Sequence, residues 1–257
     1  MNDINNKAKH LQKIISKMCS LVVAFSGGLD SSYLLAMAVD TIGNNNVIAA
    51  TARAPFFSPF ETQYIDSVIG KTRARHIVFD HQAMSQEIFT NNPPDRCYHC
   101  KKMIFTTIKN IADKYSIQHI VHGANTDDLN EYRPGTRAAQ EFGIEAPLTD
   151  AHLSKSEISH FAKDMGLENW NQPAMACLAT RIPYNSVITN EKLSMIHQAE
   201  QALFNMGFSG ARVRWIDRAA KIEIQKHQKP EFLKGQYQHK IFNQLIDIGF
   251  LDVIVAL

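Results

Sequence analysis

A short run of small and polar residues follows the first apolar segment, and its composition suits an anionic ligand. Residues 22–25 are apolar, Ser26-Gly27-Gly28 comes next, and apolar residues then recur with helical spacing. This order predicts a strand, a tight turn and a helix, with the turn at the helix N-terminus. Glycines let a ligand approach the backbone, and the first N–H groups of a helix attract negative charge. We therefore predict a phosphate-binding turn formed by Ser26, Gly27, Gly28, Asp30, Ser31 and Ser32.

The sequence of this turn differs from that of ordinary nucleotide hydrolases. It lacks the Gly-Lys-Ser/Thr ending of the Walker P-loop. It resembles instead the Ser-Gly-Gly-X-Asp-Ser turn of the PP-loop pyrophosphatases, which adenylylate a substrate with ATP and release pyrophosphate. The resemblance implies that Asp30 helps to hold Mg²⁺, which prefers carboxylates together with substrate phosphates. The alternative interpretation is a plain strand-to-helix turn capped by Ser26.

The chain has four cysteines, and two of them are spaced for a shared ligand. Cys97 and Cys100 precede a predicted helix, so both sulfurs could reach one metal or cluster, and a helix N-terminus lowers thiol pKa values. A redox disulfide, half of a zinc site and unrelated thiols are the alternatives. Cys19 precedes the first strand, at the sheet edge away from the turn, and is predicted to be a buried bystander. Cys97, Cys100 and Cys177 remain as candidate ligands of an iron–sulfur cluster.

Short apolar runs alternate with helical patterns in the first part of the chain. Further strands are predicted at 47–52, 76–79 and 119–122, with helices at about 59–71 and 100–115. This alternation predicts an α/β fold with a parallel sheet covered on both faces. Ligands bind beyond the carboxyl ends of such strands. Gly123 and Asn125, in the loop after the fourth strand, are therefore candidate nucleotide-binding residues, with a solvated turn as the alternative.

The pattern changes after a helix that opens with the capping box Ser154-Lys155-Ser156-Glu157. The rest reads as a smaller α+β domain, with elements predicted at 190–206 (helix), 211–216 and 220–225 (strands), up to 248 (helix) and 251–256 (strand). We predict two domains, residues 1–182 and 183–257.

Composition limits the classes of partner. The 257 residues include 27 Lys and Arg against 25 Asp and Glu, a formal net charge of +2. This balance gives no electrostatic case for a nucleic-acid partner. No run approaches the roughly 20 apolar residues that span a bilayer, and the N-terminus carries no signal-peptide pattern. The expected protein is cytoplasmic, with no membrane partner.

Four segments together resemble one family. They are residues 23–31, 130–135, 176–184 and 211–214, and they resemble the LarE-type ATP-dependent sulfur transferases along nearly the whole chain. The resemblance implies a PP-loop (adenine nucleotide alpha hydrolase-like) domain and an AMP- and pyrophosphate-forming sulfurtransferase. The implied acceptor is a small-molecule nucleotide, pyridinium-3,5-biscarboxylate mononucleotide, on the route to a nickel-pincer nucleotide. It also implies a homo-oligomer.

The resemblance also assigns roles to residues. Some members surrender the sulfur of a cysteine at the position of Cys177, leaving dehydroalanine, whereas others carry an extra Cys-X-X-Cys and are thought to use a [4Fe-4S] cluster. Residues 94–102 resemble the second kind, which implies a cluster held by Cys97, Cys100 and Cys177. Cys177, Asp30 and Arg181 are the implied catalytic residues, with Arg181 orienting a substrate carboxylate or phosphate. The implied phosphate ligands are Arg212 and Arg214, and the implied divalent-ion ligands are Glu200, Glu223 and Glu231.

Other functions remain open at this point. A sacrificial Cys177 without a cluster is one alternative, and another PP-loop enzyme, a tRNA thiolase or an amide-forming synthetase, is a second. A non-catalytic nucleotide-binding or iron–sulfur carrier protein belongs to a different class, and it would bind ATP without releasing pyrophosphate.

Overall fold

This computed structural model describes residues 2–57, 63–130, 134–172 and 176–256. Contacts divide the chain into two compact units. Unit 1 comprises residues 1–54, 59–83 and 95–174, and unit 2 comprises residues 55–58, 84–94 and 175–257. The expected start of a helix at Pro59 and part of the family-like segment 130–135 lie outside the described residues.

Unit 1 is built on a four-stranded sheet with the order β3-β2-β1-β4, and all neighbouring strands are parallel. The strands are β1 (Leu21–Ala24), β2 (Val47–Arg53), β3 (Arg75–Asp80) and β4 (His119–His122). The two central strands are the most apolar, since residues 21–23 and 47–50 are buried. Strands covered on both faces need such continuous apolar runs. The predicted α/β class with a parallel sheet is confirmed.

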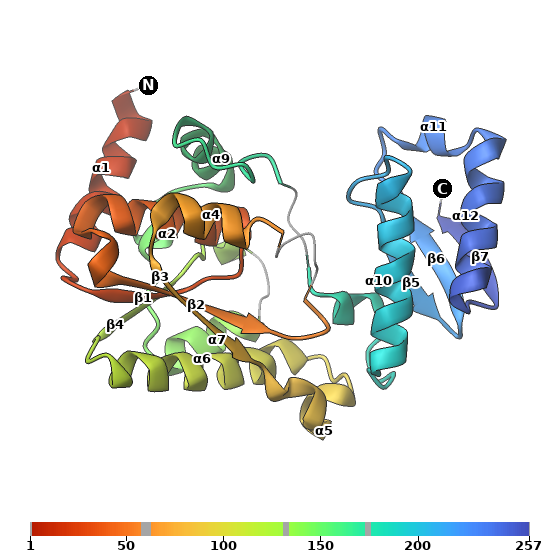
Figure 1. The fold of residues 1–257 in the computed structure, drawn as a ribbon, viewed down its shortest axis with the longest axis horizontal. Coiled ribbons are helices and arrows are strands. Elements are labelled where there is room, and N and C mark those ends of the chain that lie inside the picture. The colour runs from red at the N-terminus through yellow and green to blue at the C-terminus, as the bar shows by residue number, and fades with distance from the viewer. Residues whose placement is uncertain (1, 58–62, 131–133, 173–175, 257) are drawn as a thin grey trace. The chain divides into compact units, whose positions relative to one another are not determined.

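Helices cover both faces of this sheet, as Figure 1 shows. On one side lie α1, α2, α4 and α9, whose apolar residues form the main core with β1 and β2. On the other side lie α6 and α7. The helices of unit 1 are α1 (Asn2–Ser16), α2 (Leu29–Ile42), α4 (Ile65–Thr72), α6 (Arg96–Lys114), α7 (Pro134–Glu141), α8 (Pro147–Asp150) and α9 (Lys155–Asp164). Short 3-10 helices are η1 (Asn44–Asn46), η2 (Gln82–Ser85) and η3 (Thr126–Asn130).

Two helix starts differ from the sequence prediction. Residues 63 and 64 form a turn, so α4 begins only at Ile65. Helix α6 begins at Arg96, ahead of the expected start near Cys100, with Asp95 at the N-cap position but without a side-chain capping hydrogen bond. The capping box of α9 is confirmed, since Ser154 and Glu157 exchange both of its hydrogen bonds.

Unit 2 is built on a three-stranded sheet with the order β5-β6-β7. Its elements are α5 (Glu87–Thr90), η4 (Leu178–Arg181), α10 (Asn190–Asn205), β5 (Arg212–Ile216), β6 (Ala219–Glu223), α11 (Lys229–Phe232), α12 (Gly235–Ile248) and β7 (Asp252–Ala256). Strands β5 and β6 are antiparallel, and β7 joins β6 in parallel. Asp217 and Arg218 form the two-residue hairpin loop with φ of 45° and 70°, as the right-handed twist of a hairpin requires.

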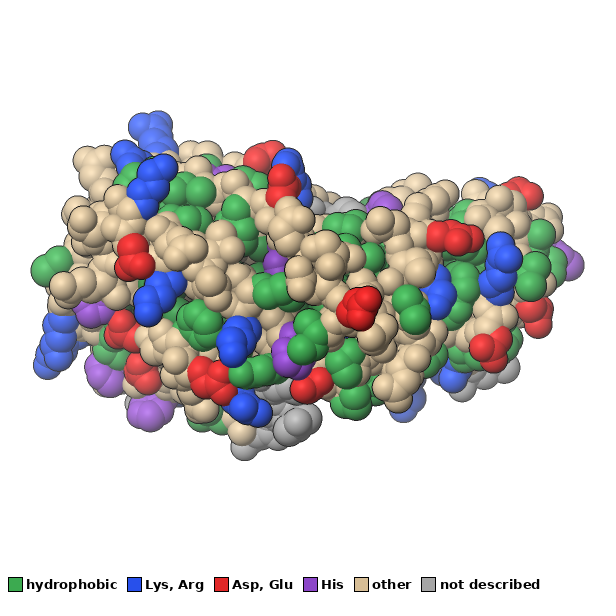
Figure 2. Space-filling view, turned by 90° about the horizontal axis from the view of Figure 1, so that it is seen from below, with side chains coloured by type: hydrophobic (Ala, Val, Ile, Leu, Met, Phe, Trp, Pro, Cys, Tyr) green, Lys and Arg blue, Asp and Glu red, His purple; other side chains and the backbone are tan. Residues whose placement is uncertain are grey.

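The contact units do not follow the expected domain ranges in detail. The C-terminal segment of unit 2 begins at residue 175 rather than at the expected 183. Unit 2 also includes two segments from the first half of the chain, residues 55–58 and 84–94. The division into domains 1–182 and 183–257 stays a prediction. Among the described helices, none is long and apolar enough to cross a membrane. On the face shown in Figure 2, basic and acidic side chains are interspersed, in keeping with the small net charge.

Candidate functional site

The predicted phosphate turn, residues 26–32, lies where the sequence places it, between the carboxyl end of β1 and the N-terminus of α2. Gly27 has φ of +86°, a conformation that favours glycine. Serine side chains stabilise the turn from within: Ser31 Oγ donates to Gly28 O at 3.0 Å and lies 3.1 Å from Ser26 Oγ. Gly28 N–H donates to Ser26 Oγ at 3.3 Å. Gly28, rather than Ser26, is the N-cap, and no side chain caps the helix.

Asp30 stands in the first turn of α2, half-buried. The helix dipole favours a negative charge at this position, and a carboxylate is a ligand that Mg²⁺ prefers. The turn therefore combines N–H groups for an anion with a carboxylate for its counterion. Ser32 is fully buried behind it, so its hydroxyl faces the protein.

A chain of hydrogen bonds fixes the strand end that carries the turn. Thr51 Oγ1 on β2 donates to Phe25 O at 2.9 Å, and His76 Nε2 on β3 lies 2.9 Å from the same hydroxyl. Because the one hydroxyl proton goes to Phe25, His76 must donate from Nε2. Burial lowers the pKa of His76, partly opposed by Asp66, which favours the neutral ring with its proton on Nε2.

The loop after β4 meets the phosphate turn at Gly123. A Cβ at this position would lie 2.8 Å from Ser31 N, a distance that side chains do not adopt, so glycine permits the close approach. Asn125 is 1% exposed and its Oδ1 accepts from Asp127 N–H at 2.9 Å. The structure therefore brings Gly123 to the turn, whereas the Asn125 side chain holds its own loop.

Cys97 and Cys100 lie inside the first turns of α6, not before it, because the helix starts at Arg96. Residues three apart share one face of a helix. His81, just past the end of β3, places Nε2 3.2 Å from Cys100 Sγ. Burial, with Lys101 as the smaller cause, lowers the pKa of His81 to about 4. A neutral imidazole therefore contacts one of the two half-buried thiols.

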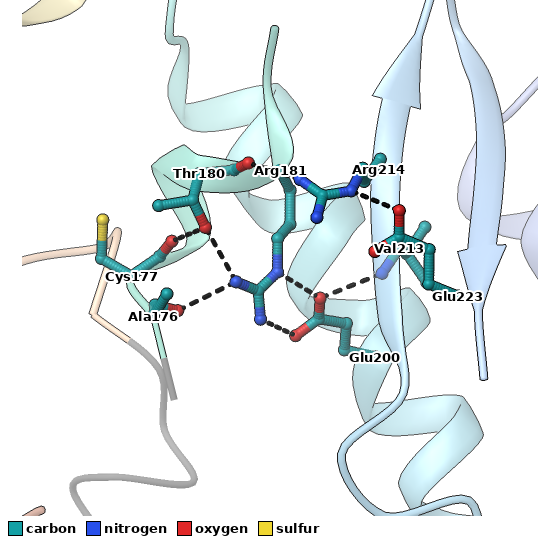
Figure 3. Close-up of polar contacts among 8 residues, drawn as sticks. All are labelled: Ala176, Cys177, Thr180, Arg181, Glu200, Val213, Arg214 and Glu223. Carbon is teal, nitrogen blue, oxygen red and sulfur yellow. Dashed lines mark hydrogen bonds and ion pairs between the residues drawn. The ribbon is translucent and has the colours of Figure 1, made fainter. Parts of the chain in front are cut away.

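Cys177 belongs to unit 2, where a buried ion pair supports its segment (Figure 3). Arg181 and Glu200 side chains are each 1% exposed and form a two-bond pair of 2.7 and 3.2 Å. Arg181 Nη1 also donates to Ala176 O at 3.0 Å and Thr180 Oγ1 at 2.8 Å. The guanidinium thus holds the backbone just before Cys177 and the Thr180 hydroxyl, which in turn donates to Cys177 O at 2.8 Å.

Glu200 extends this support to the sheet of unit 2. Its Oε1 also accepts from Val213 N–H on β5 at 3.0 Å, so the carboxylate joins α10, η4 and β5. Glu200 is 2% exposed and both of its carboxylate oxygens accept from Arg181, so it is not an open metal ligand in this structure. The predicted substrate-orienting role of Arg181 stays a prediction; in this structure its guanidinium is engaged by protein acceptors.

Arg212 and Arg214 share one face of β5, opposite the buried Val213 and Trp215. Arg214 donates to Glu223 Oε1 at 2.6 Å and to Thr180 O at 3.1 Å. Its hydrogen bond to the Glu223 carboxylate lowers the pKa of Glu223. Arg212 stands opposite Glu223 in the strand register. Two guanidiniums on one strand face are suited to a phosphate group.

The three predicted divalent-ion ligands do not gather around one point. Glu200 pairs with Arg181, Glu223 with Arg214, and the exposed Glu231 with Lys234. Within the described residues, no three His, Cys, Asp or Glu side chains come together as a metal ion requires. The divalent-ion site therefore stays a prediction.

The expectation for Cys19 is wrong in one respect. It precedes β1 as predicted, but its side chain is exposed rather than buried, because it occupies a turn with φ of 56°. The four cysteines, all among the described residues, form no disulfide. Thr51, His76, His81 and Asn169 also contribute to this region, and the sequence does not indicate them because no motif surrounds them.

The fold and the turn define the class: an α/β protein with a glycine turn at the carboxyl edge of a parallel sheet, the edge where such proteins bind ligands. No family model matches the chain. It is 30% identical over 257 residues, 100% of this chain and 92% of the relative, to the pyridinium-3,5-bisthiocarboxylic acid mononucleotide synthase of Lactiplantibacillus plantarum. Uncharacterized proteins of Synechocystis and Methanocaldococcus jannaschii are 32% and 30% identical, over 99% and 98% of the chain and 94% of each relative.

These full-length similarities decide the family. The chain belongs to the LarE family, that of the Lactiplantibacillus plantarum synthase.

Proposed function

We propose that this protein transfers sulfur to a carboxylate of a pyridinium mononucleotide after activating that carboxylate with ATP. The observation that carries the proposal is the similarity to a bisthiocarboxylic acid mononucleotide synthase over the whole chain, including the phosphate turn. The product for which that relative is named carries two thiocarboxylates, and the corresponding acceptor here is pyridinium-3,5-biscarboxylate mononucleotide.

The need for ATP follows from the chemistry of the acceptor. A carboxylate is a poor electrophile, so its oxygen first attacks the α-phosphorus of ATP, and pyrophosphate leaves. Sulfide then attacks the acyl carbon, and AMP leaves with its electron pair. The N–H groups of the turn and Asp30 with Mg²⁺ suit the first step, as in PP-loop enzymes. Arg212 and Arg214 suit the acceptor's phosphate.

The cysteines fit an iron–sulfur cluster as the sulfur carrier. Cys97 and Cys100 share one face of α6 in its first turns, and Cys177 is half-buried on a segment held by Arg181. We propose that these three thiolates hold a [4Fe-4S] cluster. Such a cluster, when bound, supplies an iron without a protein ligand that can carry sulfide.

Product analysis tests the proposal. The anaerobically purified protein is incubated with ATP, Mg²⁺, sulfide and the biscarboxylate mononucleotide, and nucleotide and thiocarboxylate products are measured by mass spectrometry. AMP, pyrophosphate and a thiocarboxylate in equal amounts are expected. Asp30→Asn should abolish all three, because an amide cannot replace the charge of the carboxylate on Mg²⁺. ADP and orthophosphate as products would contradict the proposal.

A further inference from the structure

Asn169 reaches the phosphate turn from a distant part of unit 1. It lies in the turn that follows α9 and is fully buried. Its Nδ2 donates to Gly27 O at 3.0 Å and to Ser32 Oγ at 2.9 Å, across 142 and 137 positions of the sequence. A buried amide that donates both of its N–H groups to one turn restrains the geometry of that turn.

The chemistry of the partners fixes how the amide is oriented. Gly27 O can only accept, so nitrogen and not oxygen must face it. Ser32 Oγ, which accepts from Asn169, also approaches Gly27 O at 3.4 Å as a donor. The carbonyl of Gly27 is therefore held from two sides, while Asn169 Oδ1 finds no hydrogen-bond donor among the described residues.

Holding this carbonyl also directs the next N–H group. In a trans peptide the C=O of Gly27 and the N–H of Gly28 point in opposite directions. With the carbonyl turned toward Asn169, the Gly28 N–H points away from it and donates to Ser26 Oγ at 3.3 Å, on an exposed residue at the solvent side of the turn. Two successive glycines allow this peptide plane to rotate unless something restrains it.

We propose that Asn169 is a positioning residue of the nucleotide site, which locks the Gly27–Gly28 peptide so that its N–H faces the phosphates. The inference deepens the proposed function and rests on it for the identity of the ligand. The lock itself belongs to the protein without nucleotide, so the two can be tested apart.

The experiment compares Asn169→Leu and the isosteric Asn169→Asp with a matched control. Ser159 Oγ donates to Trp170 O at 2.6 Å, so Ser159→Ala loosens the same segment without touching the turn. Deuterium exchange of a peptide covering residues 25–32 is measured without nucleotide, and the dissociation constant of Mg²⁺·ATP by calorimetry. Near-ultraviolet circular dichroism verifies that each variant is folded.

Both Asn169 variants should exchange faster in the turn and bind ATP about ten- to a hundredfold more weakly, the size expected for lost buried hydrogen bonds. Ser159→Ala should match the wild type in both measurements. Unchanged exchange in the Asn169 variants, or equal losses in Ser159→Ala, would overturn the proposal. If the wild type binds no ATP, the proposed function is overturned, and the exchange comparison alone decides the role of Asn169 in the turn.

Discussion

Single residues at this site act mainly by permitting or enforcing a backbone position. Gly123 is the clearest case, since any side chain there would collide with the backbone at Ser31. Gly123→Ala should therefore lower the free energy of unfolding by about 1–3 kcal/mol and weaken nucleotide binding, because the start of α2 must move.

Chemical denaturation and ATP titration test this change. Gly70→Ala is the control: it lies in α4 with no atom within 4 Å of the added Cβ, so it should stabilise the protein by about 0.5–1 kcal/mol. A stable Gly123→Ala variant with wild-type affinity would show that the contact is not restrictive.

The buried pair Arg181–Glu200 is the second residue-scale device. Arg181→Leu leaves the carboxylate of Glu200 buried without its partner, and such a loss costs about 3–5 kcal/mol. The double variant Arg181→Leu, Glu200→Leu should recover part of that loss, because no charge stays buried. Urea denaturation of both singles and the double measures the coupling. Additive effects would contradict a direct pair.

Residues of this kind mark the limit of sequence interpretation. The Ser26–Ser32 turn was predictable because strand, glycines and helix are adjacent in the chain. Asn169 and Glu200 were not assigned their roles, because their partners lie 142 and 19 positions away and each forms its contacts only after the elements have packed. From the sequence alone, a charged residue on a helix is expected to be exposed to solvent.

At the scale of elements, the start of α6 differs from its prediction, which placed Cys97 and Cys100 before the helix. Pro93, Pro94 and Asp95 predicted a turn, and the apolar period of the helix becomes visible only further on, so its first turn was assigned to the loop. Strands were predicted more closely, because buried parallel strands need uninterrupted apolar runs that periodicity detects directly.

From the packing of α6 against β4 we predict how the stability of the protein depends on pH. Burial, with Lys101 of α6 as the smaller cause, lowers the pKa of His122 on β4 to about 4. An unfolded histidine has a pKa near 6.5, so the unfolded state binds more protons between about pH 4 and 6.5, and stability is lost as pH falls through this window.

Denaturation at pH 7 and pH 5 measures this effect. His122 contributes a loss on the order of 2 kcal/mol over this interval, and His81, with a pKa also lowered to about 4, adds to it. His122→Gln should reduce the difference between the two pH values. His10→Gln, at an exposed position of α1, should not. An identical pH dependence in His122→Gln would refute the assignment.

At the scale of the whole molecule, the cysteines separate two ways of carrying sulfur. Cys97 and Cys100 belong to unit 1 and Cys177 to unit 2. Cys97→Ala, Cys100→Ala and Cys177→Ala should each lower the iron bound after anaerobic reconstitution, because a cluster loses stability with any thiolate ligand. The exposed Cys19 provides the matched control, and Cys19→Ala should keep its iron.

Iron and sulfide analysis with the visible spectrum measures cluster content, and intact mass after one turnover measures the fate of Cys177. With a cluster, Cys177 keeps its sulfur and turnover continues as long as sulfide is supplied. A sacrificial mechanism converts Cys177 to dehydroalanine, which lowers the mass of the protein by that of one hydrogen sulfide, and it stops after one turnover. That mass loss, in protein that binds no iron, would refute the cluster, yet it would leave ATP activation intact, because the phosphate turn and its supports contain no cysteine.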